Sequence, residues 1–378
     1  MNIGIPREVR RSETRIAITP ETADRFVKLG LSVTIERGVG EALIWPDATY
    51  ESVGATVAER SEVLSGGDIL LRVGLPALED IPLMKSGVIH VGFLDPFGQK
   101  EIVAALAAQG VRAVSMEMMP RSTVAQKMDA LSSQHSLAGY YMVILAAERL
   151  GKTLPMMMTP SGTIQPARVF VIGAGVAGLQ AIATAKRLGA RVEAFDTRPV
   201  VSEQVESLGA KFLHIDLGET GQTDQGYALE LTPEQQHRQH QGMSEACVRA
   251  DIVITTAQLF GRPAPRVVTA DMLDAMKPGA VVVDYAVESG GNVEGSISGK
   301  EIDIHGVRVI GLENYPGRVA LDASRMYANN LYYFIETIWD KESRGIKTAA
   351  DDGCLAGALV TDGGKIVNEQ VLKHYRTG

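Results

Sequence analysis

Three glycines, Gly173, Gly175 and Gly178, stand between a short apolar run and a helical pattern. The apolar run Val169–Ile172 has the composition of a buried strand, and Leu179–Leu188 has the spacing of a helix. In such a strand, turn and helix, the first glycine makes a tight turn and the second lets a pyrophosphate approach the backbone. The third lets the helix pack closely on the strand. The pattern therefore predicts an α/β sheet with a dinucleotide-binding turn.

The residues around this turn include further candidate ligand contacts. Val176 and Ala177 lie between the second and third glycines, just before the predicted helix, whose N-terminus would face the phosphates. Asp196 ends the next predicted strand, where a carboxylate accepts hydrogen bonds from ribose hydroxyls and repels a 2′-phosphate, so NAD(H) is favoured over NADP(H). Thr197 and Arg198 follow as candidate contacts, and the Arg198 cation weakens the argument against a 2′-phosphate. The alternative is a glycine-rich turn with no ligand.

The composition argues against several classes of protein. The chain has 378 residues, 45% of them hydrophobic and 22% charged, which suits two domains with large cores. A net charge of −8 without a basic run argues against a nucleic-acid partner. Cys247 and Cys354 form no CxxC pair, so we expect a reducing cytoplasm and neither a disulfide scaffold nor a zinc site. The charged N-terminus and the glycines within residues 169–185 argue against a signal peptide and a membrane span.

Alternating strand and helix patterns predict an α/β fold with two parallel-sheet domains and a cleft between them. We expect residues 1–131 and the tail 322–378 to form the N-terminal domain, and residues 132–321 to form a Rossmann dinucleotide-binding domain. Strand patterns cover residues 3–5, 16–18, 31–35, 69–73, 88–94 and 111–116 in the first domain, and 169–172, 192–195, 212–215, 252–255, 281–284 and 307–310 in the second.

Other segments predict the connections between these strands. Residues 137–150 have the pattern of a long helix that bridges the two domains, and residues 324–341 that of a final amphipathic helix. Asp362-Gly363-Gly364 indicates a hairpin in the tail. A polar insertion over residues 216–242 includes what we interpret as a solvated helix face at residues 235–239. An insertion of this length is typical of a lid or a mobile loop.

Several further segments resemble one known family. They are Gly4–Glu8, Arg15–Pro20, MPRSTVAQKMDALSSQHSLAG over residues 119–139, Pro155–Thr159, GVAGLQAIATAKRLGA from Gly175, Glu203–Gly209, Thr255–Thr256, Gly261–Pro265 and Asp284–Asn292. Over nearly its whole length the chain is similar to the NAD(H)-binding domain of proton-translocating NAD(P) transhydrogenases, which are related to alanine dehydrogenases.

The resemblance assigns the most specific segment to the nicotinamide end of the nucleotide. It implies that Arg121, Gln126 and Asp129 lie on a loop at the domain cleft and set NAD(H) against NADP(H) on a second subunit, with Ser132 also in contact. A guanidinium, an amide and a carboxylate on one loop have the donors and acceptors to hold a carboxamide and ribose hydroxyls. Without the resemblance, these residues would be interpreted as a solvated loop.

The resemblance also implies contacts outside that loop. Thr256, Ala257 and Gln258 would line the adenosine pocket, although the family has an aliphatic residue in place of Gln258. Asn314 and Pro316 would approach the cleft from the other side.

In the family a mobile loop closes a tyrosine over the nucleotide. Tyr227 stands at that position, but the insertion departs from the family pattern around it. An aromatic side chain with only local packing is therefore an equal alternative.

Two rival functions are open at this point. An amino-acid dehydrogenase similar to alanine dehydrogenase needs a proton acceptor and a group that binds the keto acid. Gly74 stands where that family has its lysine, and His90 lies too early for its histidine. Hydride transfer between two nicotinamides needs no acid or base, so these departures favour transhydrogenation. The second rival is a non-catalytic module that binds or senses NAD(H); it would not need the outward-facing polar loop around Gln126.

The resemblance further implies partners and a location. The enzyme would be complete only with separate membrane-spanning and NADP(H)-binding transhydrogenase subunits. The chain would form a homodimer, lie in the cytoplasm, and dock on the inner face of the plasma membrane through those partners. No metal is expected.

Overall fold

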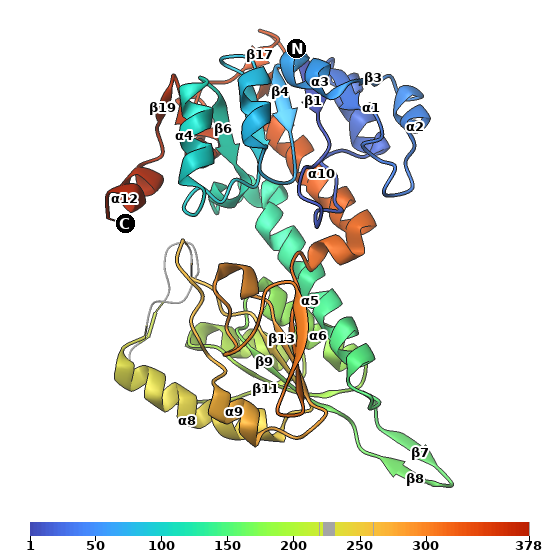
Figure 1. The fold of residues 1–378 in the computed structure, drawn as a ribbon, viewed down its shortest axis with the longest axis vertical. Helices are drawn as coiled ribbons and strands as arrows, with labels where there is room; N and C mark the ends of the chain where they lie inside the picture. Colours follow the sequence, from blue (N-terminus) through green and yellow to red (C-terminus); the bar gives the residue numbers. More distant parts are fainter. Residues whose placement is uncertain (219, 222–230, 260, 378) are drawn as a thin grey trace. The chain divides into compact units, whose positions relative to one another are not determined.

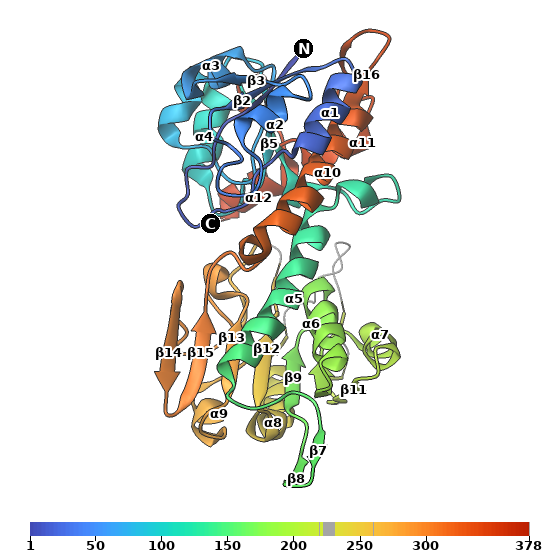
Figure 2. The same ribbon diagram turned by 90° about the vertical axis from the view of Figure 1, so that its right-hand side faces the viewer.

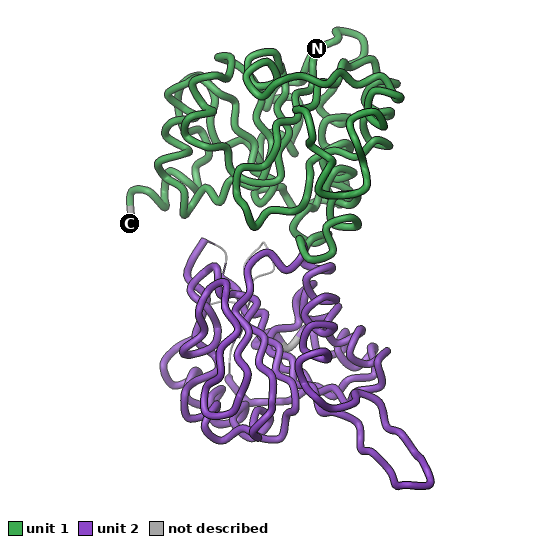
Figure 3. Tube along the Cα trace, turned by 45° about the vertical axis from the view of Figure 1, so that its right-hand side comes forward, with its two compact units in different colours: residues 1–134, 317–378 green, residues 135–316 purple. Residues whose placement is uncertain are grey.

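The computed structural model describes residues 1–377 except 219, 222–230 and 260. The chain divides into two compact units, which Figure 3 shows in different colours. Unit 1 comprises Met1–Gln134 and Gly317–Gly378, and unit 2 comprises His135–Pro316. The first division falls inside helix α5 (Ala130–Arg149), which begins earlier than the helix predicted over residues 137–150.

Unit 1 contains a six-stranded parallel sheet of order β3-β2-β1-β4-β5-β6 (Figure 1). Its strands are short apolar runs, as expected of strands that are buried on both faces. They are β1 (Asn2–Ile5), β2 (Ser32–Glu36), β3 (Thr56–Ala58), β4 (Ile69–Leu71), β5 (Ile89–Gly92) and β6 (Arg112–Ser115).

Helices cover both faces of this sheet. The helices α1 (Pro20–Lys28) and α10 (Ala320–Ile338) contribute Phe26 and Phe334 to one core. Helix α3 (Arg60–Gly66) packs on β1 and β2, and α4 (Lys100–Ala108) packs on β6. The capping box of Thr19 and Thr22 begins α1, and proline occupies its first position. The unit also contains the short helix α2 (Asp47–Glu51) and the 3-10 helices η1 (Leu78–Leu83), η2 (Met116–Met118) and η3 (Ala125–Met128). The 3-10 helix η6 (Pro316–Val319) begins at the last residue of unit 2 and continues into unit 1.

The C-terminal tail returns to unit 1. The Val360 N–H donates to the Ala113 carbonyl, and the Thr361 hydroxyl donates to the Val111 carbonyl at 2.7 Å, so the tail lies beside β6. The predicted hairpin around Gly363 is confirmed by the pairing of β18 with β19. The tail elements are β16 (Trp339–Asp340), β17 (Gly345–Ile346), α11 (Gly353–Ala358), β18 (Thr361–Asp362), β19 (Lys365–Ile366) and α12 (Glu369–Thr377).

Unit 2 contains a seven-stranded sheet of order β11-β10-β9-β12-β13-β15-β14, in which only the edge strand β14 is antiparallel (Figure 2). The strands are β9 (Arg168–Ile172), β10 (Arg191–Phe195), β11 (Lys211–Phe212), β12 (Ile252–Thr255), β13 (Val281–Asp284), β14 (Lys300–Ile304) and β15 (Val307–Gly311). The six parallel strands have the order of a Rossmann fold.

Two helical layers enclose the sheet of unit 2. Helices α5 and α6 (Val176–Arg187) pack on the face that holds Val169 and Val171. Helices α8 (Pro233–Arg249) and α9 (Ala270–Ala275) pack on the face that holds Phe170 and Ile172. The remaining elements are α7 (Ser202–Ser207), the 3-10 helices η4 (Pro199–Val201) and η5 (Val287–Ser289), and the strands β7 (Met157–Thr159) and β8 (Gly162–Ile164).

The strand predicted over Ile16–Ile18 is wrong. These residues are buried but irregular, and the Ile16 N–H donates to the Ser324 hydroxyl instead of to a neighbouring strand. The segment leads directly into the Thr19 cap of α1. Apolar composition therefore identified a core segment here but not its conformation. The prediction also missed β3, β14 and the β7–β8 hairpin.

The helix predicted over residues 235–239 is confirmed as part of α8, which begins at the Thr232 cap; Gln236 and His237 are exposed, whereas Gln235 and Gln239 are partly buried. No helix within the described part of the chain is long and apolar enough to cross a membrane.

Candidate functional site

In the turn between β9 and α6, the three predicted glycines differ in how strictly the fold requires them. Gly173 has a φ of +96°, which strains any other residue. A Cβ on Gly178 would lie 1.9 Å from the Gly173 carbonyl oxygen, so only glycine lets the helix approach this closely. A Cβ on Gly175 would meet no protein atom within 4 Å. Two glycines are thus required by the fold, and the third leaves open space where a ligand's phosphates would approach the backbone.

The N-terminus of α6 has the features of an anion site. Gly175 is its N-cap, no side chain caps the helix, and its first turn contains no acidic residue. The first N–H groups of a helix have no partner inside the helix and carry a partial positive charge. Val176 is 41% exposed at this end, whereas Ala177 is buried against the core. The residues that follow β9 therefore present backbone donors beside the open position at Gly175.

Asp196 lies at the end of β10, as predicted, but its carboxylate is already bound. Its Oδ2 accepts the Ala174 N–H at 2.7 Å, and both oxygens accept hydrogen bonds from the Arg198 guanidinium at 2.8 and 2.9 Å. The Arg198 backbone N–H donates to Oδ1 as well, at 2.9 Å. Water reaches little of this pair, because only 14% of the Arg198 side chain and 6% of the Asp196 side chain are exposed. The neighbouring Thr197 is partly buried, and its carbonyl accepts the Thr220 hydroxyl at 2.7 Å.

The residues after β12 form the other side of the turn. The Thr256 hydroxyl donates to the Gly173 carbonyl at 3.0 Å, and a Cβ on Gly173 would collide with this hydroxyl. The Ala257 carbonyl accepts the Asn292 side-chain amide at 2.8 Å. Gln258 is partly buried. The structure therefore brings Thr256 and Ala257 next to the glycine turn, at the point where the strand order reverses.

Two structural residues near this turn had no predicted role of their own. Asp284, at the end of β13, is fully buried and accepts the N–H groups of Ala286, Asn292 and Val293. Asn292 in turn binds the carbonyls of Ala257 and Pro265. The sequence shows that both residues follow an apolar strand. It does not show whether a carboxylate at such a position binds backbone groups or a ligand.

Asn314 and Pro316 follow β15 in the same unit. Asn314 has a φ of +50°, and its backbone N–H donates to the Glu288 carboxylate at 3.0 Å. Pro316 is buried, and Tyr315 between them is 1% exposed. Asn314 therefore holds an uncommon backbone conformation in the loop after a parallel strand.

The predicted nicotinamide loop precedes α5 and belongs to unit 1. Arg121 and Gln126 have exposed side chains, Gln126 within the 3-10 helix η3. Asp129 and Ser132 bind each other: the Asp129 carboxylate accepts the Ser132 N–H at 2.8 Å and its hydroxyl at 2.5 Å. This is the geometry of a helix N-cap, so Asp129 stabilises the start of α5. Tyr227 lies outside the described residues.

The carboxyl edge of the unit 1 sheet contains no lysine at position 74. Gly74 instead donates its N–H to the Glu8 carboxylate at 3.1 Å. His90 is completely buried, and neither ring nitrogen has a hydrogen-bond partner. Burial, with the nearby Arg72 cation, lowers the pKa of His90 to about 3, so its ring is neutral at pH 7. The Arg15 guanidinium is held by Glu13 and the Gln134 amide.

These features define a class of protein: a Rossmann-type dinucleotide-binding unit joined to a second parallel α/β unit. The chain belongs to the alanine dehydrogenase/PNT family, whose N-terminal domain model matches residues 4–138 and whose C-terminal domain model matches residues 142–369.

Three relatives illustrate this membership. The chain is 43% identical over 376 residues to an NAD(P) transhydrogenase subunit alpha protein of Rhodospirillum rubrum, covering 97% of this chain and 98% of that protein. A crystal structure of transhydrogenase from Sinorhizobium meliloti superposes with a TM-score of 0.84 at 42% identity, covering 98% of this chain and 100% of that one. The alanine dehydrogenase of Mycolicibacterium smegmatis is 29% identical, covering 99% of this chain and 96% of that protein.

Proposed function

We propose that this chain binds NAD(H) on unit 2 and exchanges hydride with NADP(H) held by a partner subunit, within a proton-translocating transhydrogenase. The observation that carries the proposal is the open position at Gly175, beside the N-terminus of α6 and bounded by two glycines that the fold requires. The relatives named as transhydrogenase subunits support the same activity.

The dinucleotide would lie across the carboxyl ends of the unit 2 strands. Its pyrophosphate would bind the backbone N–H groups after Gly175, and its adenosine would lie near Thr256 and Ala257. The ribose hydroxyls would meet Asp196, whose lone pairs are shared with Arg198 and Ala174. Arg198 therefore has to release part of the carboxylate, or to remain and contact the nucleotide itself.

Hydride transfer between two nicotinamide rings moves one hydrogen nucleus with two electrons. The C–H bond at C4 of the reduced ring breaks and a C–H bond at C4 of the oxidised ring forms, so no separate proton donor is required. In this proposal the protein orients the rings and excludes water. Gln126 and Arg121, exposed on the loop before α5, are the residues we assign to this positioning, and Asp129 and Ser132 hold that loop to the helix.

The amino-acid dehydrogenase alternative is disfavoured by the residues of unit 1. Gly74 offers no side chain to polarise a carbonyl, and Glu8 occupies its backbone N–H. His90 is buried and has a pKa of about 3, so it is not suited to carry a proton at neutral pH.

Partners and location follow from the same proposal. The membrane-spanning and NADP(H)-binding components would be supplied by other transhydrogenase subunits. The chain would dock on them at the cytoplasmic face of the plasma membrane.

A homodimer belongs to the proposal as well. The β7–β8 hairpin stands away from the rest of unit 2 (Figure 1), and Met156, Met157, Met158 and Ile164 on it are 43–75% exposed. An isolated two-stranded hairpin is marginally stable in water, and exposed methionines favour burial against a partner. A second copy of the chain is the occupant we propose for this surface.

A mixing experiment tests the activity. The purified chain is combined with the NADP(H)-binding domain of a transhydrogenase, NADPH and an oxidised NAD analogue, and reduction of the analogue is followed by absorbance. We expect fast turnover in the mixture and none with either protein alone. Tight NADH binding without turnover would support a sensing module instead. Oxidation of NADH by the chain alone with pyruvate and ammonia would support the dehydrogenase.

The variant Gln126→Asn tests the positioning role. It keeps the amide and shortens the side chain by one methylene, so we expect an unchanged NADH affinity and a turnover slower by roughly tenfold. Thr123→Ser, an equally conservative change at another exposed position of the same loop, is the control and should retain full turnover. If NADH affinity and turnover fell together in Gln126→Asn, Gln126 would be a binding contact and not a positioning residue.

A further inference from the structure

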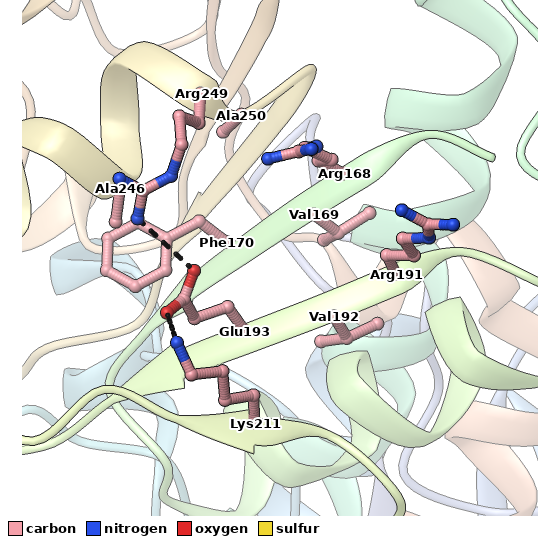
Figure 4. Close-up of a pocket in the computed structure, with 10 residues that line it drawn as sticks. All are labelled: Arg168, Val169, Phe170, Arg191, Val192, Glu193, Lys211, Ala246, Arg249 and Ala250. Atoms are coloured by element: carbon pink, nitrogen blue, oxygen red, sulfur yellow. Dashed lines mark hydrogen bonds and ion pairs between the residues drawn. The ribbon is translucent and has the colours of Figure 1, made fainter. Parts of the chain in front are cut away.

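Unit 2 has a hollow at the edge of its sheet opposite to the glycine turn. It has a volume of about 490 Å³ and lies at the amino ends of β9, β10 and β11, beside the end of α8 (Figure 4). Four cationic side chains line it together with one acidic side chain: Arg168, Arg191, Lys211 and Arg249, and Glu193. Such a surplus of positive charge contrasts with the net charge of −8 of the chain.

Two of the cations are register partners in the sheet. Arg168 pairs with Arg191 across the parallel strands β9 and β10, so their side chains leave the same face of the sheet. Neighbouring strands lie about 4.8 Å apart, and like charges on adjacent positions repel each other. Among the described residues, neither guanidinium has a hydrogen bond or an ion pair with a protein group. This pair is therefore an uncompensated charge that the sheet itself creates.

The acidic residue of the hollow compensates the other two cations. Glu193 forms ion pairs with Lys211 at 3.3 Å and with Arg249 at 3.8 Å, which Figure 4 marks by dashed lines. Arg249 is additionally 3.4 Å from Glu245. The charges of Lys211 and Arg249 are thus largely balanced, while those of Arg168 and Arg191 are not.

A further carboxylate at the amino end of β9, that of Asp251, is occupied by other groups. Asp251 accepts the backbone N–H of Arg168 at 2.8 Å and forms ion pairs with Lys152 at 3.0 Å and Lys277 at 3.3 Å. These three groups lower the pKa of Asp251, although burial opposes them most strongly. Asp251 therefore binds the backbone at the amino end of β9 and holds the Lys152 and Lys277 cations close to it.

We propose that the hollow is an anion-binding site for a compact, soluble ligand that carries two phosphate groups. Guanidinium groups bind phosphate oxygens in a bidentate manner, and two arginines at paired positions of adjacent strands can each bind one of two linked phosphates. The rest of the lining is apolar and adds no side-chain polar groups that would select a nucleobase or sugar; it consists of Val169, Phe170, Val192, Ala246 and Ala250. The five residues of β9 separate this site from the glycine turn, so one dinucleotide does not occupy both.

Calorimetric titration of the whole chain with inorganic pyrophosphate tests the proposal at constant ionic strength. The double variant Arg168→Gln/Arg191→Gln should bind pyrophosphate more weakly by roughly tenfold or more, since it loses two charge-assisted contacts. Arg187→Gln/Arg308→Gln is the matched control: it removes two exposed arginines of the same unit that do not line the hollow. It should bind pyrophosphate like the unchanged chain.

Two further measurements keep the result interpretable. Glu193→Gln releases Lys211 and Arg249, so it should tighten pyrophosphate binding, and orthophosphate should bind the unchanged chain more weakly than pyrophosphate. Removal of Arg191 alone should raise the melting temperature at low salt by relieving repulsion, which also shows that the variant folds. Equal pyrophosphate binding by both double variants, which a site at the N-terminus of α6 would produce, or no binding by the unchanged chain, would overturn the proposal.

Discussion

The two sheets of this protein have the same order of parallel strands. They differ in the residues that lie at the carboxyl ends of those strands. In unit 1 the order is β3-β2-β1-β4-β5-β6, and in unit 2 the parallel strands follow the same pattern with an antiparallel strand added at one edge. In each sheet the strand order reverses between two central neighbours, β1 and β4 in unit 1 and β9 and β12 in unit 2. Open α/β sheets bind ligands at such a point. The chain after the first strand is Gly173–Gly175 in unit 2 and Pro6–Glu8 in unit 1.

Unit 1 fills its crevice with its own side chains. The Glu8 carboxylate accepts the N–H groups of Val73 and Gly74 after β4, which are donors that a ligand would otherwise use. Next to it, Arg72 is fully buried and forms an ion pair with Asp80 at 2.9 Å. Burial raises the pKa of Glu8, and the Arg72 cation and the two N–H groups oppose that rise. The strand order therefore creates a position where a ligand can bind. The residues after β1 in unit 1 and after β9 in unit 2 determine whether protein side chains or a ligand occupy that position.

The largest effect is expected from breaking the charge network of unit 1. Asp80→Ala removes the ion-pair partner of Arg72 and one partner of Arg60, and it leaves the buried Arg72 guanidinium with the Arg7 carbonyl as its hydrogen-bond acceptor but without an ion pair. We expect the free energy of unfolding to fall by about 4 kcal/mol in urea titrations. Lys28→Ala breaks the exposed ion pair with Asp24 and should cost at most about 0.5 kcal/mol. A small loss in Asp80→Ala would mean that water, and not Asp80, satisfies Arg72.

A comparison of two glycines tests the open crevice of unit 2. Gly178→Ala places a Cβ against a backbone oxygen and should lower the free energy of unfolding by about 3 kcal/mol and abolish NADH binding. Gly175→Ala adds the same methyl group where no protein atom lies within 4 Å. It should keep the stability and weaken NADH binding by roughly tenfold, because the methyl group enters the space of the phosphates. Fluorescence titration with NADH measures the affinity. Unchanged affinity in Gly175→Ala would show that the phosphates bind elsewhere.

A pH titration of stability tests the buried histidine of unit 1. The pKa of His90 is lowered to about 3 in the folded chain, so between about pH 6.5 and 3 the unfolded state binds a proton that the folded state does not. His90 therefore adds no pH-dependent cost above pH 6.5, and below that pH it lowers the free energy of unfolding by about 1.4 kcal/mol per pH unit down to about pH 3. His90→Leu should flatten that slope in urea titrations between pH 6.5 and 5. The same slope in the variant would assign the effect to other groups.

Most strands were predictable because a buried parallel strand is a short apolar run between polar turns. This signal failed at Ile16–Ile18, where the same composition belongs to an irregular core segment. It also missed β14, whose sequence Lys-Glu-Ile-Asp-Ile alternates polar and apolar residues as an edge strand does. Burial from both sides produces a strong pattern, and an edge strand with one exposed face produces a weaker one.

The sequence predicted the glycine turn of the candidate site but not the hydrogen-bond partners of its carboxylates. The glycines were evident because their spacing reflects local steric limits, which the structure bears out at Gly173 and Gly178. The hydrogen bonds of Asp129 with Ser132 and of Asp196 with Arg198 were not foreseen. Both partners were visible in the sequence, but a carboxylate near a cation or a hydroxyl has several possible partners until the backbone conformation selects one.

The sequence by itself determined the alternation of strands and helices, the place of the dinucleotide turn and the family, because each depends on local patterns of composition and spacing. Only the tertiary structure decided which carboxylates bind protein groups, that Glu8 closes the crevice of unit 1, and that Arg168 and Arg191 stand side by side. These arrangements join residues from different strands and loops. Their partners are selected by strand order and register, which no short segment of the sequence specifies alone.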